Sequence, residues 1–187
     1  MAKTLSTMSA LGTKAHPFSL INVVDGSVFH FTQQHTHKAT VIMFICNHCP
    51  YVKHILEALV SLTKTYQNNE TILFIGINSN DVNAYPDDAP IHMQSLAKEM
   101  AFTFPYLFDE TQDVAKTYHA ACTPDFFVFN NENSLVYRGQ FDNSRPGNAI
   151  IPTGKDLKTA IDCLLNDIPI PDNQLPSLGC NIKWKDN

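Results

Sequence analysis

The stretch Val41-Ile42-Met43-Phe44-Ile45-Cys46-Asn47-His48-Cys49-Pro50-Tyr51-Val52 joins an apolar run to a Cys-x-x-Cys motif. The apolar run predicts a buried strand, and the motif lies where an amphipathic segment begins. Two thiols would therefore meet the first turn of a helix, whose free N–H groups and positive dipole end favour a thiolate. The pattern predicts that Cys46 is a nucleophile of low pKa and that Cys49 is its resolving partner.

His48 lies between the two cysteines. Once protonated, it would stabilise the Cys46 thiolate, favour the dithiol and make the disulfide more oxidising. Half of a zinc site and a pair of buried, inert thiols are the alternative interpretations. A structural zinc site usually needs a second Cys/His pair at ligand spacing, and Cys122, Cys163 and Cys180 are each isolated. We therefore favour a redox pair, with no metal and no cofactor.

Length and composition limit the classes of protein to consider. The chain has 187 residues, 44% of them hydrophobic and 17% charged, which is ordinary for one soluble globular domain. A net charge of −5 argues against nucleic acid or a membrane as a partner, since both favour a basic face. No run has the length of a membrane span or of a signal peptide. We expect a cytoplasmic protein, in which a Cys-x-x-Cys is catalytic or metal-binding.

Hydrophobic patterning predicts the order of elements along the chain. Residues 18–31 form a hairpin around Asp25-Gly26, and the buried strands 40–45 and 71–78 flank an amphipathic helix at 51–66. The later elements are a helix opened by Pro90 and capped by Asp87 or Asp88, a strand at 104–108, a short helix after Thr111, a strand at 121–129 paired with 135–141, and a helix at 155–166. This order predicts an α/β fold with a mixed central sheet, helices on both faces and an N-terminal β-hairpin.

The motifs together indicate a family. A Cys-x-x-Cys after a central strand and Thr-Pro before a late hairpin resemble the thioredoxin superfamily. The chain is most similar to the peroxiredoxin-like branch related to alkyl hydroperoxide reductase and thiol-specific antioxidant proteins. The segments that carry the resemblance are 44–52, 122–129, 137–142 and 179–184. The resemblance implies a thioredoxin-like fold, with an N-terminal arm at 1–14, a domain at 15–167 and a C-terminal tail at 168–187 packed on the domain.

The resemblance also assigns roles to residues. Cys46 matches the attacking cysteine, Cys49 the resolving cysteine and Pro124 the cis-proline of the family. Thr123 precedes that proline and would offer its backbone to an extended substrate chain. One departure concerns peroxide chemistry, because Met43 stands where peroxiredoxins carry a threonine three residues before the peroxidatic cysteine.

Other positions leave alternatives open. Thr40 stands where thioredoxin buries an acidic residue, so no carboxylate base for Cys49 is evident in the sequence. Cys122, two residues before Pro124, is either a third redox or metal-capable thiol near the site or a small buried side chain. Cys180, in the tail, is either a second resolving thiol, as in some peroxiredoxins, or inert.

Three functions are consistent with these residues. The leading hypothesis is a thiol–disulfide oxidoreductase that acts on protein or small-molecule disulfides and receives electrons from a thiol donor. The second is a thiol peroxidase, in which peroxide oxidises Cys46 to a sulfenic acid that Cys49 condenses with. The third is a non-catalytic thioredoxin-like module, in which Cys46, Cys49 and Cys122 or Cys180 hold a metal or a partner.

Overall fold

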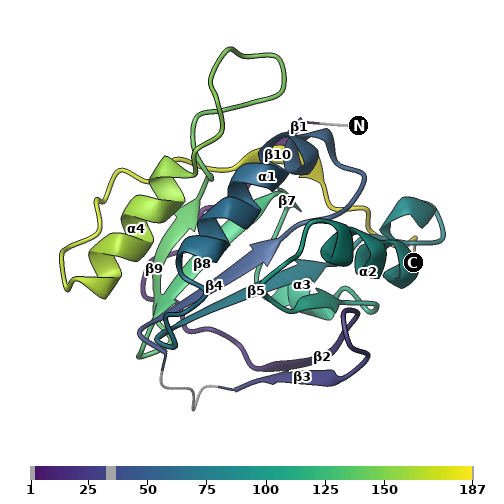
Figure 1. Cartoon of the computed structure of the whole chain (residues 1–187), viewed down its shortest axis with the longest axis horizontal. Helices are drawn as coiled ribbons and strands as arrows, with labels where there is room; N and C mark the ends of the chain where they lie inside the picture. Colours follow the sequence, from purple (N-terminus) through teal and green to yellow (C-terminus); the bar gives the residue numbers. More distant parts are fainter. Residues whose placement is uncertain (1–2, 33–36, 187) are drawn as a thin grey trace.

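A mixed sheet forms the centre of the computed structural model. Within the residues that the structure describes, 3–32 and 37–186, the strand order of this seven-stranded sheet is β3-β2-β6-β5-β4-β8-β9 (Figure 1). Its strands are β2 (Phe18–Asn22), β3 (Val28–Phe31), β4 (Ala39–Phe44), β5 (Ile72–Asn78), β6 (Tyr106–Phe108), β8 (Asp125–Asn130) and β9 (Leu135–Gly139). Because β4 pairs parallel with β5 and antiparallel with β8, the sheet is mixed, and the predicted α/β fold with its N-terminal hairpin is confirmed.

The central strand β4 is buried on both faces. All six of its residues are buried, as its uninterrupted apolar run predicts. Val41 and Met43 belong to one hydrophobic cluster, whereas Ile42 and Phe44 belong to a second cluster on the opposite face. This alternation is the period of two expected for a strand. The core therefore has two halves, one on each side of the sheet.

Helices cover both halves of the core, as predicted. The helices are α1 (Pro50–Thr65), α2 (Pro90–Glu99), α3 (Asp113–Thr117) and α4 (Lys155–Leu165). Buried side chains of α1, α2 and α4 join the first cluster, whereas Ala115 of α3 joins the second. Figure 1 shows α1 lying across the sheet, with α4 beside it. Among the described residues, no helix combines the length and the apolarity needed to cross a membrane.

The predicted strand at 121–129, entered through Pro124, is present as two strands. It divides into β7 (Cys122–Thr123) and β8, with Pro124 between them. Proline has no N–H group to donate to a ladder, so it interrupts the pairing. β7 instead joins β1 (Lys3–Leu5) and β10 (Leu178–Asn181) in a separate small sheet of order β1-β10-β7.

The arm at 1–14 and the tail at 168–187 meet in this small sheet. Lys3 pairs with Cys180, and Cys180 pairs with Thr123 on the other side of β10. Residues 1–2 of the arm and residue 187 of the tail lie outside the described residues. The tail strand is thus placed directly against the segment that leads into Pro124.

Gly179 allows the close approach of β10 to β7. A Cβ atom at Gly179 would lie 2.1 Å from the carbonyl oxygen of Thr123. We expect Gly179→Ala to lower the free energy of unfolding by at least about 2 kcal/mol. The atoms that the new methyl group would meet belong to the backbone at Thr123, which cannot move aside as a flexible side chain can. Urea unfolding measures the loss. Asn181→Ala in the same strand adds no atom and serves as the control; equal losses in both variants would contradict this packing argument.

Candidate active site

The CNHC turn joins β4 to α1 and places both thiols below the surface. Cys46 is 1% exposed and Cys49 is fully buried. Because α1 begins at Pro50, Cys49 is its N-cap residue, and its carbonyl accepts a bond from the Lys53 N–H at 3.0 Å. Cys46 therefore precedes the helix instead of lying in its first turn. The positive end of the helix dipole acts more directly on Cys49 than on Cys46.

Thr123 contacts both thiols through different atoms. Its hydroxyl oxygen lies 3.2 Å from Cys46 Sγ, and its carbonyl oxygen accepts a hydrogen bond from the Cys49 thiol at 3.1 Å. The peptide bond that follows, Thr123–Pro124, is cis. The structure thus brings together four of the residues that the sequence assigns to the site, namely both cysteines of the motif, Thr123 and Pro124.

Protonation of the two thiols is coupled. Burial raises the pKa of Cys46 well above that of a free thiol, and Cys49 and Asp88 further oppose its ionisation. A hydrogen bond from Cys46, helped by the backbone N–H of Val52, lowers the pKa of Cys49 to about 5. The bond from Cys49 to the Thr123 carbonyl acts in the opposite direction, because it needs the proton. The surroundings thus shift the two pKa values in opposite directions, and the predicted low pKa of Cys46 is wrong for this geometry, because burial raises it.

A third thiol, that of Cys180, extends the pair. Cys180 is paired with Thr123 across the small sheet, and its thiol hydrogen-bonds with Cys49. Burial and this bond raise the pKa of Cys180 to about 12. The Cys122 thiol instead lies 3.7 Å from the carbonyl oxygen of Pro124, and burial raises its pKa well above the ordinary value. Cys180 is thus an additional thiol beside Cys49, whereas the Cys122 thiol is buried against the carbonyl of Pro124.

Asp88 is a member of the site that sequence analysis missed. Its carboxylate is fully buried, and Oδ1 accepts the backbone N–H groups of Asn47 and His48 at 2.8 and 3.1 Å. Oδ2 accepts the Asn80 amide at 2.7 Å and lies 2.5 Å from Nδ1 of His48. Although burial alone would raise it, the hydrogen bonds, first that from His48, hold the pKa of Asp88 below its usual range. Asp88 is an ionised carboxylate that fixes the turn.

The prediction that Asp87 or Asp88 caps α2 is wrong. The N-cap residue of α2 is Ala89, which makes no side-chain capping bond. Asp88 ends the 3₁₀ turn η1 (Pro86–Asp88) and contacts the CNHC turn instead. The sequence contains one indirect signal of this arrangement. Polar residues such as Asn80 follow β5, and the carboxyl ends of the parallel strands β4 and β5 meet at one edge of the sheet.

His48 is held between Asp88 and an aromatic ring. The imidazole stacks on Tyr85 with ring centroids 5.0 Å apart, and its Nε2 is buried without a hydrogen-bond partner. A ring nitrogen of His48, a carboxylate oxygen of Asp88 and Cys46 Sγ lie within 4.8 Å of one another. These residue types also occur in metal sites. Here both oxygens of Asp88 already accept N–H groups, so the set fits a hydrogen-bonded imidazole better than a cation.

Both arginines of the chain make their hydrogen bonds away from the thiols. The Arg138 guanidinium donates to the side chain of Gln174 at 2.8 Å. That of Arg145 donates to the side chain of Gln140 and to the carbonyl of Asp142. Peroxide activation relies on donors aimed at the reacting oxygen. None of these hydrogen bonds of the two guanidinium groups reaches Cys46.

Comparisons with known proteins place the chain among its relatives. Residues 11–138 match the model of the AhpC/TSA family. A solved structure of an uncharacterized conserved protein from Geobacillus kaustophilus is 50% identical, covers 100% of this chain and 98% of that chain, and has a TM-score of 0.96. A hypothetical protein from Sinorhizobium meliloti 1021 is 41% identical, with coverages of 98% and 100% and a TM-score of 0.94.

A more distant neighbour shows the fold alone. It is a thiol:disulfide interchange protein of the thioredoxin family from Chlorobium tepidum TLS, 18% identical, with a TM-score of 0.62. The match covers 84% of this chain and 99% of that chain. The comparison with curated proteins gives no match.

A second buried carboxylate, Asp125, follows Pro124. It is 1% exposed, and its Oδ2 has no hydrogen-bond partner. Burial raises the pKa of Asp125 well above its usual range. The folded protein therefore holds this proton more tightly than the unfolded chain does.

This raised pKa makes the stability depend on pH. The contribution of Asp125 is complete below its unfolded pKa of about 4 and is lost as the pH rises through the folded pKa. Asp125→Asn cannot ionise, so we expect the wild-type free energy of unfolding to fall relative to that of the variant as the pH rises. Urea unfolding at about pH 5, 7 and 9 tests this, since all other groups are common to both proteins. Parallel pH curves would refute the assignment.

Proposed function

The chain belongs to the AhpC/TSA family and has a thioredoxin-like redox function, and we propose that it acts as a thiol–disulfide oxidoreductase through a Cys46/Cys49 couple. The observation that carries this proposal is the contact of Thr123 with both sulfurs. Its hydroxyl is the group that lowers the pKa of Cys46 against the effect of burial. One residue thus favours charge on the attacking sulfur and a proton on the resolving one.

The reaction exchanges one disulfide for another. Cys46, as the thiolate, attacks a sulfur of the substrate disulfide and forms a mixed disulfide, while the other substrate sulfur leaves and takes up a proton. Cys49 then attacks Cys46 Sγ, and the second substrate sulfur leaves as a thiol. The products are the Cys46–Cys49 disulfide and two substrate thiols. A thiol donor restores the dithiol, for which we propose the reducing cytoplasm as the location.

A thiol peroxidase is the second candidate, and the family match favours it. In that reaction peroxide oxidises Cys46 to a sulfenic acid, releasing water or an alcohol, and Cys49 condenses with the sulfenic acid to form the disulfide and a second water. The apolar Met43, buried beside the turn, and the hydrogen bonds of both arginines elsewhere support disulfide chemistry instead. Turnover with peroxide that exceeds turnover with disulfides would decide for the peroxidase.

Serine variants separate the roles of the two cysteines. We expect Cys46→Ser to lose more than roughly a hundredfold in the rate of disulfide reduction, because a hydroxyl is a poor substitute for a thiolate. Cys49→Ser should instead accumulate a mixed disulfide on Cys46, seen by mass spectrometry of the intact protein. Cys163→Ser, in α4, is the control and should behave as wild type. If Cys49→Ser accumulates no adduct with a peptide disulfide, the proposed couple is wrong.

Cys180 should affect the potential of the couple. Its thiol hydrogen-bonds with Cys49 and favours the thiolate there, so removing it destabilises the dithiol form. We expect Cys180→Ala to lower the midpoint potential by about 20 mV, the equivalent of one weak hydrogen bond. A titration in glutathione buffers, quenched by alkylation and mapped by mass spectrometry, measures the midpoint. A wild-type disulfide that includes Cys180 would show that it is a resolving thiol instead.

A further inference from the structure

We propose that Asp88 is a positioning residue that holds the His48 imidazole as the proton acceptor for the Cys46 thiol. This inference rests on the proposed function and names the group that receives the proton when Cys46 attacks. Its basis is the position of three side chains, two from the CNHC turn and one from η1. A ring nitrogen of His48, a carboxylate oxygen of Asp88 and Cys46 Sγ lie within 4.8 Å of one another.

The carboxylate determines which ring nitrogen is available. A carboxylate only accepts hydrogen bonds, so Nδ1 of His48 carries the hydrogen that faces Asp88 at 2.5 Å. In the neutral ring Nε2 is then left as an acceptor, and it is buried without a partner. The stack on Tyr85 fixes the plane of the ring, whose side chain is only 10% exposed. The imidazole is therefore held in one tautomer, with a lone pair that no other described group uses.

Burial explains why Cys46 needs a nearby acceptor. Its thiol is almost completely buried, and the charge of Asp88 opposes a second charge on the sulfur. Transfer of its proton to His48 produces a thiolate and an imidazolium beside the carboxylate. The net charge of the three groups is −1 before and after the transfer. An internal transfer thus avoids placing an unbalanced charge in the interior.

Each proton in the exchange is then accounted for. The Cys46 proton moves to Nε2 of His48, and the sulfur attacks the substrate disulfide. The S–S bond of the substrate breaks, and the departing thiolate takes the proton back from Nε2. The imidazole is neutral again before Cys49 displaces the second substrate thiol. No oxidant or reductant other than the substrate disulfide is needed.

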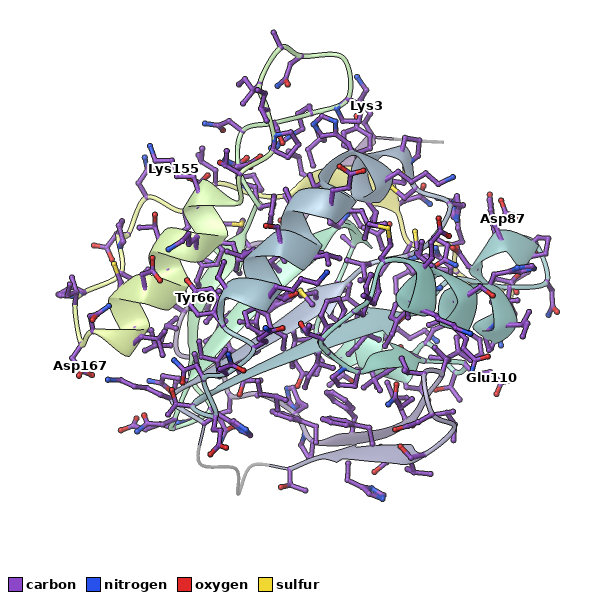
Figure 2. All side chains as sticks on the ribbon, in the orientation of Figure 1. Lys3, Tyr66, Asp87, Glu110, Lys155 and Asp167 are labelled. Carbon is purple, nitrogen blue, oxygen red and sulfur yellow. The ribbon has the colours of Figure 1, made fainter. Side chains whose placement is uncertain are left out.

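A hollow lies beside the ring of His48. It has a volume of about 240 Å³ and is lined by His48, Ala84, Tyr85, Pro86 and Asp87. Figure 2 shows Asp87 at the periphery of the molecule. The titratable groups around the imidazole are Cys46, Tyr85, Asp87 and Asp88, and Lys183 Nζ lies 5.4 Å from the centroid of the Tyr85 ring.

The charge of Asp88 alone and its positioning of His48 predict opposite results. As a charge near the sulfur, Asp88 raises the pKa of Cys46, so Asp88→Asn would make Cys46 react faster. As the residue that orients the proton acceptor, its loss would make Cys46 react more slowly. The sign of the change therefore separates the two roles. The asparagine retains an oxygen for the backbone N–H groups of the turn, which limits structural damage.

The test measures one chemical step in the full chain. In a Cys49→Ser background, stopped-flow kinetics with 5,5′-dithiobis(2-nitrobenzoate) follow formation of the mixed disulfide, and mass mapping confirms that Cys46 carries the adduct. We expect Asp88→Asn and His48→Gln each to slow this step at neutral pH by about tenfold or more. The double variant should be no slower than either single variant, because Asp88 acts through His48. Asp81→Asn, with the same change in charge, is the control and should have no effect.

A spectroscopic measurement is independent of the rate. The ¹⁵N shifts of the His48 ring should show the Nδ1–H tautomer in the wild-type protein and a mixture of tautomers in Asp88→Asn. A faster reaction of Asp88→Asn, or losses that multiply in the double variant, would overturn the inference. If the wild-type protein turns over no peptide or protein disulfide, yet Asp88→Asn and His48→Gln still slow the reaction of Cys46 with the probe, the proposed function fails and the inference stands.

Discussion

The arrangement of both thiols depends on one residue of a two-residue strand. Thr123 presents its hydroxyl to Cys46 and its carbonyl to Cys49, so a small displacement of its backbone changes the environment of both sulfurs together. Pairing with β10 fixes this backbone, and the absence of a side chain at Gly179 permits the close contact. The geometry of the redox pair is therefore determined by the tail as well as by the strand and helix that carry the motif.

Two buried carboxylates near the thiols have pKa values shifted in opposite directions. Burial raises the pKa of Asp125, whose Oδ2 has no hydrogen-bond partner, whereas four N–H donors outweigh the effect of burial at Asp88. The hydrogen bonds at Asp88 therefore account for the difference. An ionised Asp88 makes a lone thiolate at Cys46 costly. The nearby imidazole is the group that can balance this charge, which links the acidity of the thiol to the position of the ring.

Much of the fold follows from regular patterns in the sequence. The apolar run 41–45 and the helical spacing at 51–66 are long enough to predict β4 and α1, and with them the place of the Cys-x-x-Cys. The short strands β1 and β10 contain too few residues to show a period, so their pairing could not be predicted. The role of Asp88 could not be predicted from the sequence either, because its partners lie in a distant segment. The nearby Pro90 instead suggested that Asp88 caps a helix.

The late position of β10 in the chain has a consequence for synthesis. A ribosome adds Leu178–Asn181 long after it has made the CNHC turn, and domains fold as their segments become available. Until that strand pairs with Thr123, the backbone that contacts both thiols in the folded protein is not fixed in place. Oxidants and other nascent chains therefore meet Cys46 and Cys49 in a less protected form than the mature protein ever presents. Pairing of β10 with β7 is thus the contact that completes the enclosure of both thiols.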